Sequence, residues 1–417
     1  MYARRLNMSL RPLPRQKPYC TVSDFAHFLR MMFCGKLIEG DSIQEFEAAF
    51  AKVYGAQHAL AVSSCRSVFS LVLDGLDIVG GDEVVLPAFN FSAFSKILLY
   101  KGIKPVFVDI DENTLNIDAN KIEQSITSKT KAIIAVHLFG NCCEIKKICS
   151  IAQKYHLWVI EDCANAFMTT YEGRLAGTFG DVACFSLSHS KDVPTFGGGI
   201  LTTNNAELFK KILYYFEKDY RSPNMTNMVK MFLKNIFFKV MTASWVFSIF
   251  VYPIIYFFSL FGIDLIARLI EDKDAVIKGI CKKRFTNFQA YIGLHKLKEG
   301  NTMQIKRIAF AEKLNQRLSD RKNIRWPKLI EGGSHVYWNY VLLVDSPLSF
   351  IKRLLSRGID AKRMAAYDCN SYNIFKEYKR VCPVSKEIGV KALALPCYHY
   401  LKESDLAYLA ETVKDIA

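Results

Sequence analysis

Two apolar runs of the sequence end close to side chains that could do chemistry. Residues 157–160 lead directly into two carboxylates, the second of which is Asp162, and residues 183–186 precede Lys191 by five positions. In open α/β sheets ligands bind at the carboxyl ends of strands, so both side chains are candidates for one site. Taken alone, each has an ordinary explanation, because Asp162 suits a helix N-cap and Lys191 a solvated surface position.

Considered together, Asp162 and Lys191 match the needs of pyridoxal 5'-phosphate (PLP) chemistry. This cofactor requires a lysine for a Schiff base and a carboxylate that keeps its pyridine nitrogen protonated. Its phosphate requires an anion site, which hydroxyls or backbone amides at a helix N-terminus supply. Residues 63–67, Ser-Ser-Cys-Arg-Ser, open a predicted helix and are the candidate for that site.

The elements that must position these residues follow the pattern of an α/β domain, a parallel sheet with crossover helices. We expect strands at 83–86, 105–108, 132–136, 158–160, 183–186 and 200–202. Apolar spacing predicts helices at 43–54, 144–155 and 206–220. A helix at 287–299, a strand at 337–344, a helix at 348–357 and a closing helix from 404 suit a smaller C-terminal α+β domain.

Composition limits the remaining classes of protein. The chain has 417 residues, a net charge of +15 and twelve cysteines without a CxxC pair. Its length excludes a small disulfide scaffold, and its dispersed basic residues do not indicate nucleic acid as a partner. The cysteines predict buried free thiols in a reducing compartment, with no metal site. Residues 1–15 lack the apolar segment of a secretory signal, so we expect a cytoplasmic protein.

Several segments, in the same order, resemble the DegT/DnrJ sugar aminotransferases of PLP fold type I. The resemblance covers residues 37–203 and resumes from 284 to the C-terminus. It is carried by GDSIQEFEAAFAKVYGAQHALAVSS, GDEVVLPAFNFSA, KPVFVDIDENTLNID, KTKAIIAVHLFGN, VIEDCANAF, FGDVACFSLSHSK, GGGILTTN, NFQAYIGLHKL and ALALPCYHYLKESDL. It implies a mostly parallel sheet with flanking helices and PLP as cofactor.

The resemblance also implies roles for single residues. Lys191 would be the Schiff-base lysine and Asp162 the partner of the pyridine nitrogen. Phe91, in PAFNF, would stack on the cofactor ring, although a core phenylalanine is the alternative. Asn165 stands where the family usually has glutamine or histidine near the cofactor's phenolic oxygen.

The phosphate site and the subunit contact depart from the family pattern. Ser186 would place a hydroxyl on the phosphate, and the amides of Arg66 and Ser67 would complete the cup. Arg66 follows Cys65 where the family usually has Gly-Thr, so its charge could replace a hydroxyl contact. Lys282 stands where an Asn-x-Arg pattern begins in the family, and it would aim an ammonium at the partner subunit's phosphate. The alternative is a solvated helix start.

Two histidines bear on the type of reaction. Related dehydratases replace the Schiff-base lysine by histidine, but here Lys191 remains in place beside His189, which favours transamination. We expect His137 to order a strand end or the substrate pocket, outside the catalytic set. The implied reaction moves an amino group from an amino acid, expected to be glutamate, to a keto-sugar, expected to be nucleotide-linked, at a homodimer interface. The alternatives are a lipid-linked or other membrane ketone, and an idle PLP-fold membrane scaffold.

Residues 228–270 differ from the rest of the chain, with eleven aromatic residues among 43. Residues 240–263 carry no charge and are long enough to cross a bilayer, but both flanks belong to one enzyme fold. We therefore expect a helical hairpin or re-entrant pair, broken near Pro253, in one leaflet of the membrane. Lys230, Lys234, Lys239 and Arg268 would lie near head groups. The alternative is a dimerisation or core-covering insertion.

These observations divide the chain into five parts. We expect a basic N-terminal arm suited to an anionic membrane, a PLP-binding large domain, a membrane-associating insertion, a return to the large domain with a dimer-interface helix, and a small domain. Their expected bounds are 1–36, 37–227, 228–270, 271–325 and 326–417.

Overall fold

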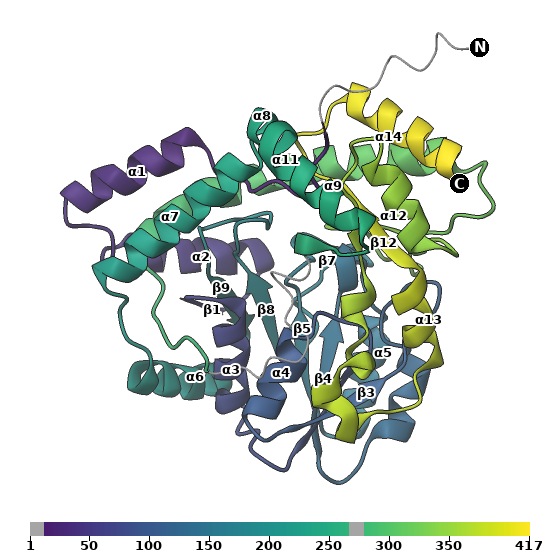
Figure 1. Ribbon diagram of the computed structural model, residues 1–417. Helices are drawn as coiled ribbons and strands as arrows, with labels where there is room; N and C mark the ends of the chain where they lie inside the picture. The colour runs from purple at the N-terminus through teal and green to yellow at the C-terminus, as the bar shows by residue number, and fades with distance from the viewer. Residues whose placement is uncertain (1–11, 267–278) are drawn as a thin grey trace, which may run out of the picture.

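A seven-stranded sheet forms the centre of the larger part of the molecule (Figure 1). The computed structural model describes residues 12–266 and 279–417. The strand order is β1-β9-β8-β5-β4-β2-β3, with β9 antiparallel to both its neighbours and all other pairs parallel. The strands are β1 (His58–Val62), β2 (Glu83–Pro87), β3 (Lys104–Val108), β4 (Thr130–Val136), β5 (Trp158–Asp162), β8 (Val182–Ser186) and β9 (Gly199–Thr203). The six expected strands are confirmed, as is the α/β class.

Helices cover both faces of this sheet, because successive strand residues point to opposite faces. Val84 and Leu86 pack into the core on the side of α3, α4 and α6, whereas Val85 belongs to the core on the side of α5. α2 and α11 pack beside β1 on that second side, in a core that includes Ala59 and Ala61. The bounds are α2 (Ser42–Tyr54), α3 (Cys65–Gly75), α4 (Ala93–Tyr100), α5 (Ile145–Lys154), α6 (Ala206–Asp219) and α11 (Asn287–Leu318).

α11 corrects the expected helix at 287–299, because it continues to Leu318 through Gly300. A Cβ atom at Gly300 would lie 3.1 Å from the Phe167 ring and 3.4 Å from the Asp192 carbonyl oxygen. This glycine therefore permits close packing inside the helix and does not end it. The added turns carry Leu314 and Leu318 into the core of the C-terminal domain, so one helix connects both parts of the enzyme.

The C-terminal domain confirms the expected α+β unit. Its antiparallel sheet has the order β10-β12-β11. Residues 337–344 were expected as a strand, and the strand observed is the shorter β10. The elements are β10 (Tyr340–Leu343), β11 (Lys362–Arg363), β12 (Ala392–Leu395), α12 (Pro347–Leu355), α13 (Pro383–Lys391) and α14 (Glu403–Ile416).

The N-terminal segment is docked into the fold, which corrects part of the expected basic arm. Residues 1–11 lie outside the described residues. Arg15 is partly buried and forms ion pairs with Asp360 at 2.7 Å and with Asp264 at 3.1 Å, so carboxylates of the protein itself neutralise its charge. Helix α1 (Val22–Phe33) then begins with a capping box at Thr21 and packs against α11.

The aromatic segment forms two helical pieces. α7 (Met225–Met241) is followed, after a bend of 65°, by a second helix that runs through α8 (Ser244–Val246), a π-helical turn (Phe247–Val251) and α9 (Tyr252–Leu260). The expectation of a break at Pro253 was wrong. Pro253 sits in the first turn of α9, directly after the π turn, where its missing N–H costs little, and the bend lies at residues 242–243.

Within the described part of the chain, no single helix is long and apolar enough to span a bilayer, and the bent pair passes that test only when its two halves are joined. The expected Arg268 lies outside the described residues.

The packing of α2 on α11 generates a stability prediction. Phe46 is fully buried, and its ring lies 5.8 Å from that of Phe285. Phe46→Ala should lower the free energy of unfolding by about 3–5 kcal/mol, because it leaves a cavity between two helices and the sheet. Urea unfolding followed by circular dichroism measures this. Val53→Ala on the same helix is the control, since Val53 is 36% exposed and should cost under about 1 kcal/mol. Equal costs would contradict the packing argument.

Candidate active site

The predicted chemical residues meet at the carboxyl ends of two neighbouring parallel strands. Asp162 ends β5 and Ser186 ends β8, and Asp162 is in register with Cys184. Lys191 lies in the loop after β8, and its Nζ donates a hydrogen bond of 2.6 Å to Oδ1 of Asn165, three residues after β5. The structure thus brings together residues that are far apart in the sequence.

Burial is the main cause of the shifted pKa values of Lys191 and Asp162. The surrounding protein disfavours the charged amine and lowers the pKa of Lys191 to about 7, although the Asp162 carboxylate opposes the shift. Burial likewise raises the pKa of Asp162 to about 6, against the Ala164 amide and the Lys191 charge. The amine of Lys191 is therefore available in its neutral, nucleophilic form near pH 7.

The N-terminus of α3 lies beside these strand ends and has the features of an anion site. Ser64 caps the helix, and the first-turn amides of Cys65 and Arg66 have no acceptor within the helix. Gly199 lets β9 approach closely, because a Cβ there would lie 2.5 Å from the Cys65 nitrogen. The Arg66 side chain is exposed at this end of the helix. The charges of Asp162, Lys191 and Arg66 all act on the partly buried Cys65 thiol, so the anion site and the amine share one region.

Ser67 already forms hydrogen bonds within the chain, including one through the amide that its expected role would use. Its amide donates to Ser64 Oγ at 3.1 Å, and its hydroxyl donates to the Cys281 carbonyl at 2.7 Å. The side chain is fully buried. Its contribution to a phosphate cup stays a prediction, as does that of the Arg66 amide.

Phe91 and Lys282 lie at the outside of this region. Phe91 follows β2 and is 53% exposed, with its ring 6.3 Å from that of Tyr367. Its alternative explanation as a core phenylalanine does not fit this exposure. Lys282 forms an ion pair with Asp219 and is also partly exposed. Stacking on a cofactor and reaching a partner subunit remain predictions for these two residues.

Trp338 and the pair Arg307–Asp192 were missed by the sequence analysis. The Lys191 Nζ lies 3.5 Å from the centre of the Trp338 ring, a cation–π distance when the amine is charged. Arg307 of α11 pairs with Asp192 and donates to the Val336 carbonyl at 2.8 Å, which ties the lysine loop to the start of the C-terminal domain. No motif marked these residues, because they contribute through contacts between distant segments.

A cleft extends from Lys191 between the two domains. Its walls include Trp338, Arg307 and His399, together with the N-terminal segment 15–19. Because the amine forms part of its surface, this cleft is where a substrate could approach Lys191.

His189 faces away from polar partners and toward the aromatic segment. Its ring stacks on Phe238 of α7, with centroids 4.7 Å apart. Burial, with the charges of Lys234 and Lys191, lowers the pKa of His189 to about 4. The imidazole is therefore neutral at pH 7 and serves as a packing group between the lysine loop and α7.

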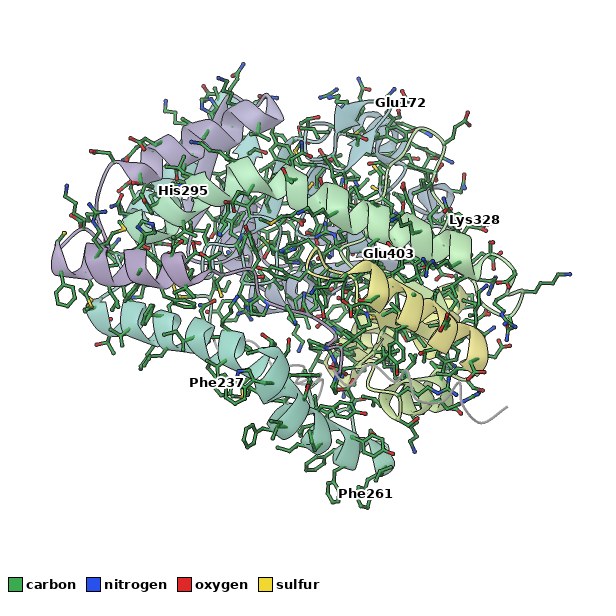
Figure 2. All side chains as sticks on the ribbon, turned by 90° about the horizontal axis from the view of Figure 1, so that it is seen from above. Glu172, Phe237, Phe261, His295, Lys328 and Glu403 are labelled. Atoms are coloured by element: carbon green, nitrogen blue, oxygen red, sulfur yellow. The ribbon has the colours of Figure 1, made fainter. Side chains whose placement is uncertain are left out.

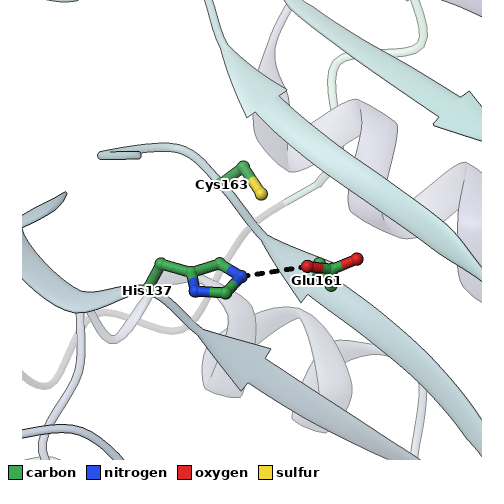
Figure 3. A group of neighbouring side chains, drawn as sticks. All are labelled: His137, Glu161 and Cys163. Atoms are coloured by element: carbon green, nitrogen blue, oxygen red, sulfur yellow. Dashed lines mark hydrogen bonds and ion pairs between the residues drawn. The ribbon is translucent and has the colours of Figure 1, made fainter. Parts of the chain in front are cut away.

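His137, Glu161 and Cys163 form a buried cluster behind the site (Figure 3), and their potential ligand atoms lie within 4.8 Å of one another. His137 Nε2 lies 3.1 Å from a Glu161 carboxylate oxygen, and Glu161 also accepts hydrogen bonds from the amides of Gly177, Phe179 and Gly180. Burial would raise the pKa of Glu161, but these hydrogen bonds hold it below its ordinary value. The donors thus satisfy the carboxylate internally, and the cluster fixes β4 to β5 as expected for His137.

The donor set fits PLP. Lys191 supplies an amine with a pKa lowered to about 7, and Asp162 supplies a carboxyl group with a pKa raised to about 6. The N-terminus of α3 offers first-turn amides that have no acceptor within the helix. These three features lie on one edge of the sheet, as the chemistry of this cofactor requires.

Comparison with known proteins places this geometry in a family. The model of the DegT/DnrJ/EryC1/StrS aminotransferase family matches residues 20–235 and 254–414. Spore coat polysaccharide biosynthesis protein SpsC of Bacillus subtilis (strain 168) is 30% identical over 97% of both chains. GDP-perosamine synthase of Escherichia coli O157:H7 is 26% identical over 90% of both chains. The family pattern leaves out only residues 236–253 of the aromatic segment, fewer than the 228–270 expected.

Solved structures show the same fold. The aminotransferase TlmJ from Streptoalloteichus hindustanus matches with a TM-score of 0.78 and 22% identity over 97% of this chain and 98% of that one. Helicobacter pylori PseC, an aminotransferase involved in the biosynthesis of pseudoaminic acid, matches with 0.77 and 20% over 97% and 99%. Since the family pattern spans both domains and a 30% identical relative aligns along the whole length, this chain belongs to the DegT/DnrJ/EryC1/StrS aminotransferase family, with PLP fold type I.

Proposed function

We propose that this enzyme uses PLP to transfer an amino group from an amino acid, expected to be glutamate, to the ketone of a nucleotide-linked sugar in surface polysaccharide biosynthesis. The printed names of relatives support the substrate class. Besides GDP-perosamine synthase, dTDP-3-amino-3,6-dideoxy-alpha-D-galactopyranose transaminase of Aneurinibacillus thermoaerophilus is 41% identical over 44% of this chain and 51% of its own. The observation that carries the proposal is the Lys191–Asn165 hydrogen bond beside Asp162.

The chain's own residues can do the proton transfers of such a reaction. When bound, PLP would act as an electron sink for the carbanion at the donor's α-carbon. Lys191 is near enough to neutral at pH 7 to accept that proton at Nζ and return it, and Asn165 orients the amine through its Oδ1. Asp162 would hold the pyridine nitrogen protonated, and Trp338 closes the opposite side of the amine to water.

Binding of the cofactor would use the remaining predicted residues. The first-turn amides of α3, the Ser186 hydroxyl and the Arg66 guanidinium would hold the phosphate, with the Ser67 amide as a further donor if it leaves Ser64. Phe91 would cover the ring.

We further propose a cytoplasmic homodimer with a site shared between subunits. Phe91 is 53% exposed, which leaves its ring accessible to a cofactor and to a second subunit. Lys282 would exchange Asp219 for the partner's phosphate site, which lies within reach only in a dimer.

The lowered pKa of Lys191 generates a prediction about the cofactor-free protein. A neutral amine reacts with electrophiles, so the rate of acetylation of Lys191 by acetic anhydride should rise with pH through a midpoint near 7, because burial lowers the pKa of its amine. Peptide mass spectrometry at a series of pH values measures the modified fraction. The exposed Lys129, outside the site, is the internal control for access of the reagent. A midpoint for Lys191 near the ordinary lysine value of about 10.4 would contradict its desolvated environment.

Substitutions test the assigned roles. Lys191→Ala should abolish turnover, with a loss of at least about 10⁴-fold, because no other amine occupies its position. Asp162→Asn should retain the cofactor but lower kcat by about a hundredfold or more, because it removes the charge opposite the pyridine nitrogen. The measurement is the cofactor's absorbance before and after glutamate, followed by mass spectrometry of the aminated sugar.

Lys129→Ala is the matched control and should leave both readings unchanged. Full turnover in Lys191→Ala, or unchanged kcat in Asp162→Asn, would remove that residue from its role. Offering a polyprenyl-diphosphate-linked keto-sugar beside the nucleotide-linked one decides between the two substrate classes. An absent cofactor absorbance in the unaltered protein would favour an idle scaffold.

A further inference from the structure

α7 and the helix after it present one continuous apolar side to the outside of the molecule. Phe237 and Phe261 project from the same edge in Figure 2. Phe250, Ile254 and Phe257, between them along the chain, are each more than half exposed, and Trp245 is 67% exposed. We call these six residues the outer face. Water-soluble monomers rarely leave an apolar surface of this extent uncovered.

The opposite side of the same helices is packed against the enzyme. Met228 and Phe232 of α7 join a core with Phe28 of α1, and Ile255 of α9 joins a core with Leu355 of α12. Tyr252 also donates a hydrogen bond to the Leu355 carbonyl. The helices are therefore held along the surface of both domains, and their outer face is directed away from the protein.

The charge of residues 225–263 indicates which kind of partner would cover the outer face. Residues 225–263 contain three lysines and no carboxylate. Lys230 and Lys234 are exposed, whereas Lys239 donates to the Cys20 carbonyl and is already used. A symmetric contact with a second copy would place these lysines together without a counter-charge from the segment. An anionic lipid surface supplies both the negative charge and the apolar layer.

We propose that the outer face docks flat onto an anionic lipid bilayer, with its aromatic rings at the level of the acyl chains and Lys230 and Lys234 at the head groups. This goes beyond the aminotransferase reaction and does not depend on it. The packing of the inner side fixes the helices parallel to the surface, so they would not dip through a leaflet as the sequence suggested.

Vesicle sedimentation of the full chain tests this directly. The protein should sediment with vesicles of phosphatidylglycerol and phosphatidylcholine, and less with phosphatidylcholine alone. The variant Phe237→Gln, Phe250→Gln, Phe257→Gln should bind at least about a hundredfold more weakly, because three rings no longer leave water. Glutamine retains helix propensity, which protects the fold. Emission of Trp245 should shift to shorter wavelength on binding, and Trp245→Phe should remove that shift.

Matched controls separate this proposal from general stickiness and from catalysis. Val79→Gln, Leu329→Gln, Val381→Gln alters three apolar residues elsewhere, each at least 51% exposed, and should leave vesicle binding unchanged. Lys191→Ala should bind vesicles as the unaltered protein does, so the proposed reaction can fail without affecting this test. An unchanged circular dichroism spectrum of the three-phenylalanine variant shows that it is folded.

Three results would overturn the proposal. In the first, the unaltered protein is not recovered with anionic vesicles at any lipid concentration. In the second, the three-phenylalanine variant binds vesicles as tightly as the unaltered protein. In the third, light scattering shows that this variant changes from dimer to monomer while the unaltered protein ignores vesicles, which identifies a second copy as the occupant of the outer face.

Discussion

The candidate site depends on keeping one amine out of water. Lys191 lies between Asn165, which follows β5, and Trp338, which precedes β10 in the other domain. Desolvation there lowers the pKa of the lysine to about 7 and makes it a nucleophile and a proton carrier. This environment exists only while the two domains are held together. The buried Arg307–Asp192 ion pair does so directly, because it joins the neighbour of the lysine to a residue of the helix that connects both domains.

The last two residues of β5, Glu161 and Asp162, are both carboxylates but have different roles. Neighbouring side chains on a strand point to opposite faces, so Glu161 and Asp162 cannot share an environment. Glu161 is fully buried and saturated by His137 and three backbone amides, which keeps it ionised and structural. Asp162 has one backbone amide and a raised pKa, so it retains capacity for a ligand. Glu161 therefore stabilises β5, the strand that positions Asp162 for a ligand.

Sequence patterns predicted the parts of this arrangement that are local. The strand ends carrying Asp162 and Ser186 follow from apolar periodicity, and the motif after β8 identifies Lys191. β1 was missed because His-Ala-Leu-Ala-Val is rich in alanine, which has low strand propensity, and becomes a strand by pairing with β9. The helix expected at 287–299 continues through Gly300, because this glycine lets α11 pack closely against Phe167 of another segment. Trp338 and Arg307 contribute only through tertiary contacts, which no local pattern contains.

The aromatic helices are integrated with the site and are not a detachable anchor. Phe238 stacks on His189, two residues before the lysine, and Asn235 donates a 3.0 Å hydrogen bond to the Phe196 carbonyl at the other end of the same loop. α7 therefore supports both ends of the segment that carries Lys191. Removing the helix would expose His189 and Phe196 to water and release that segment, so a deletion would confound surface binding with loss of the site. The ring of Phe237 lies 6.0 Å from that of Phe238, so Phe237 belongs to both roles. Single substitutions at Phe250 and Phe257, in the second helix, can separate surface binding from support of the lysine loop.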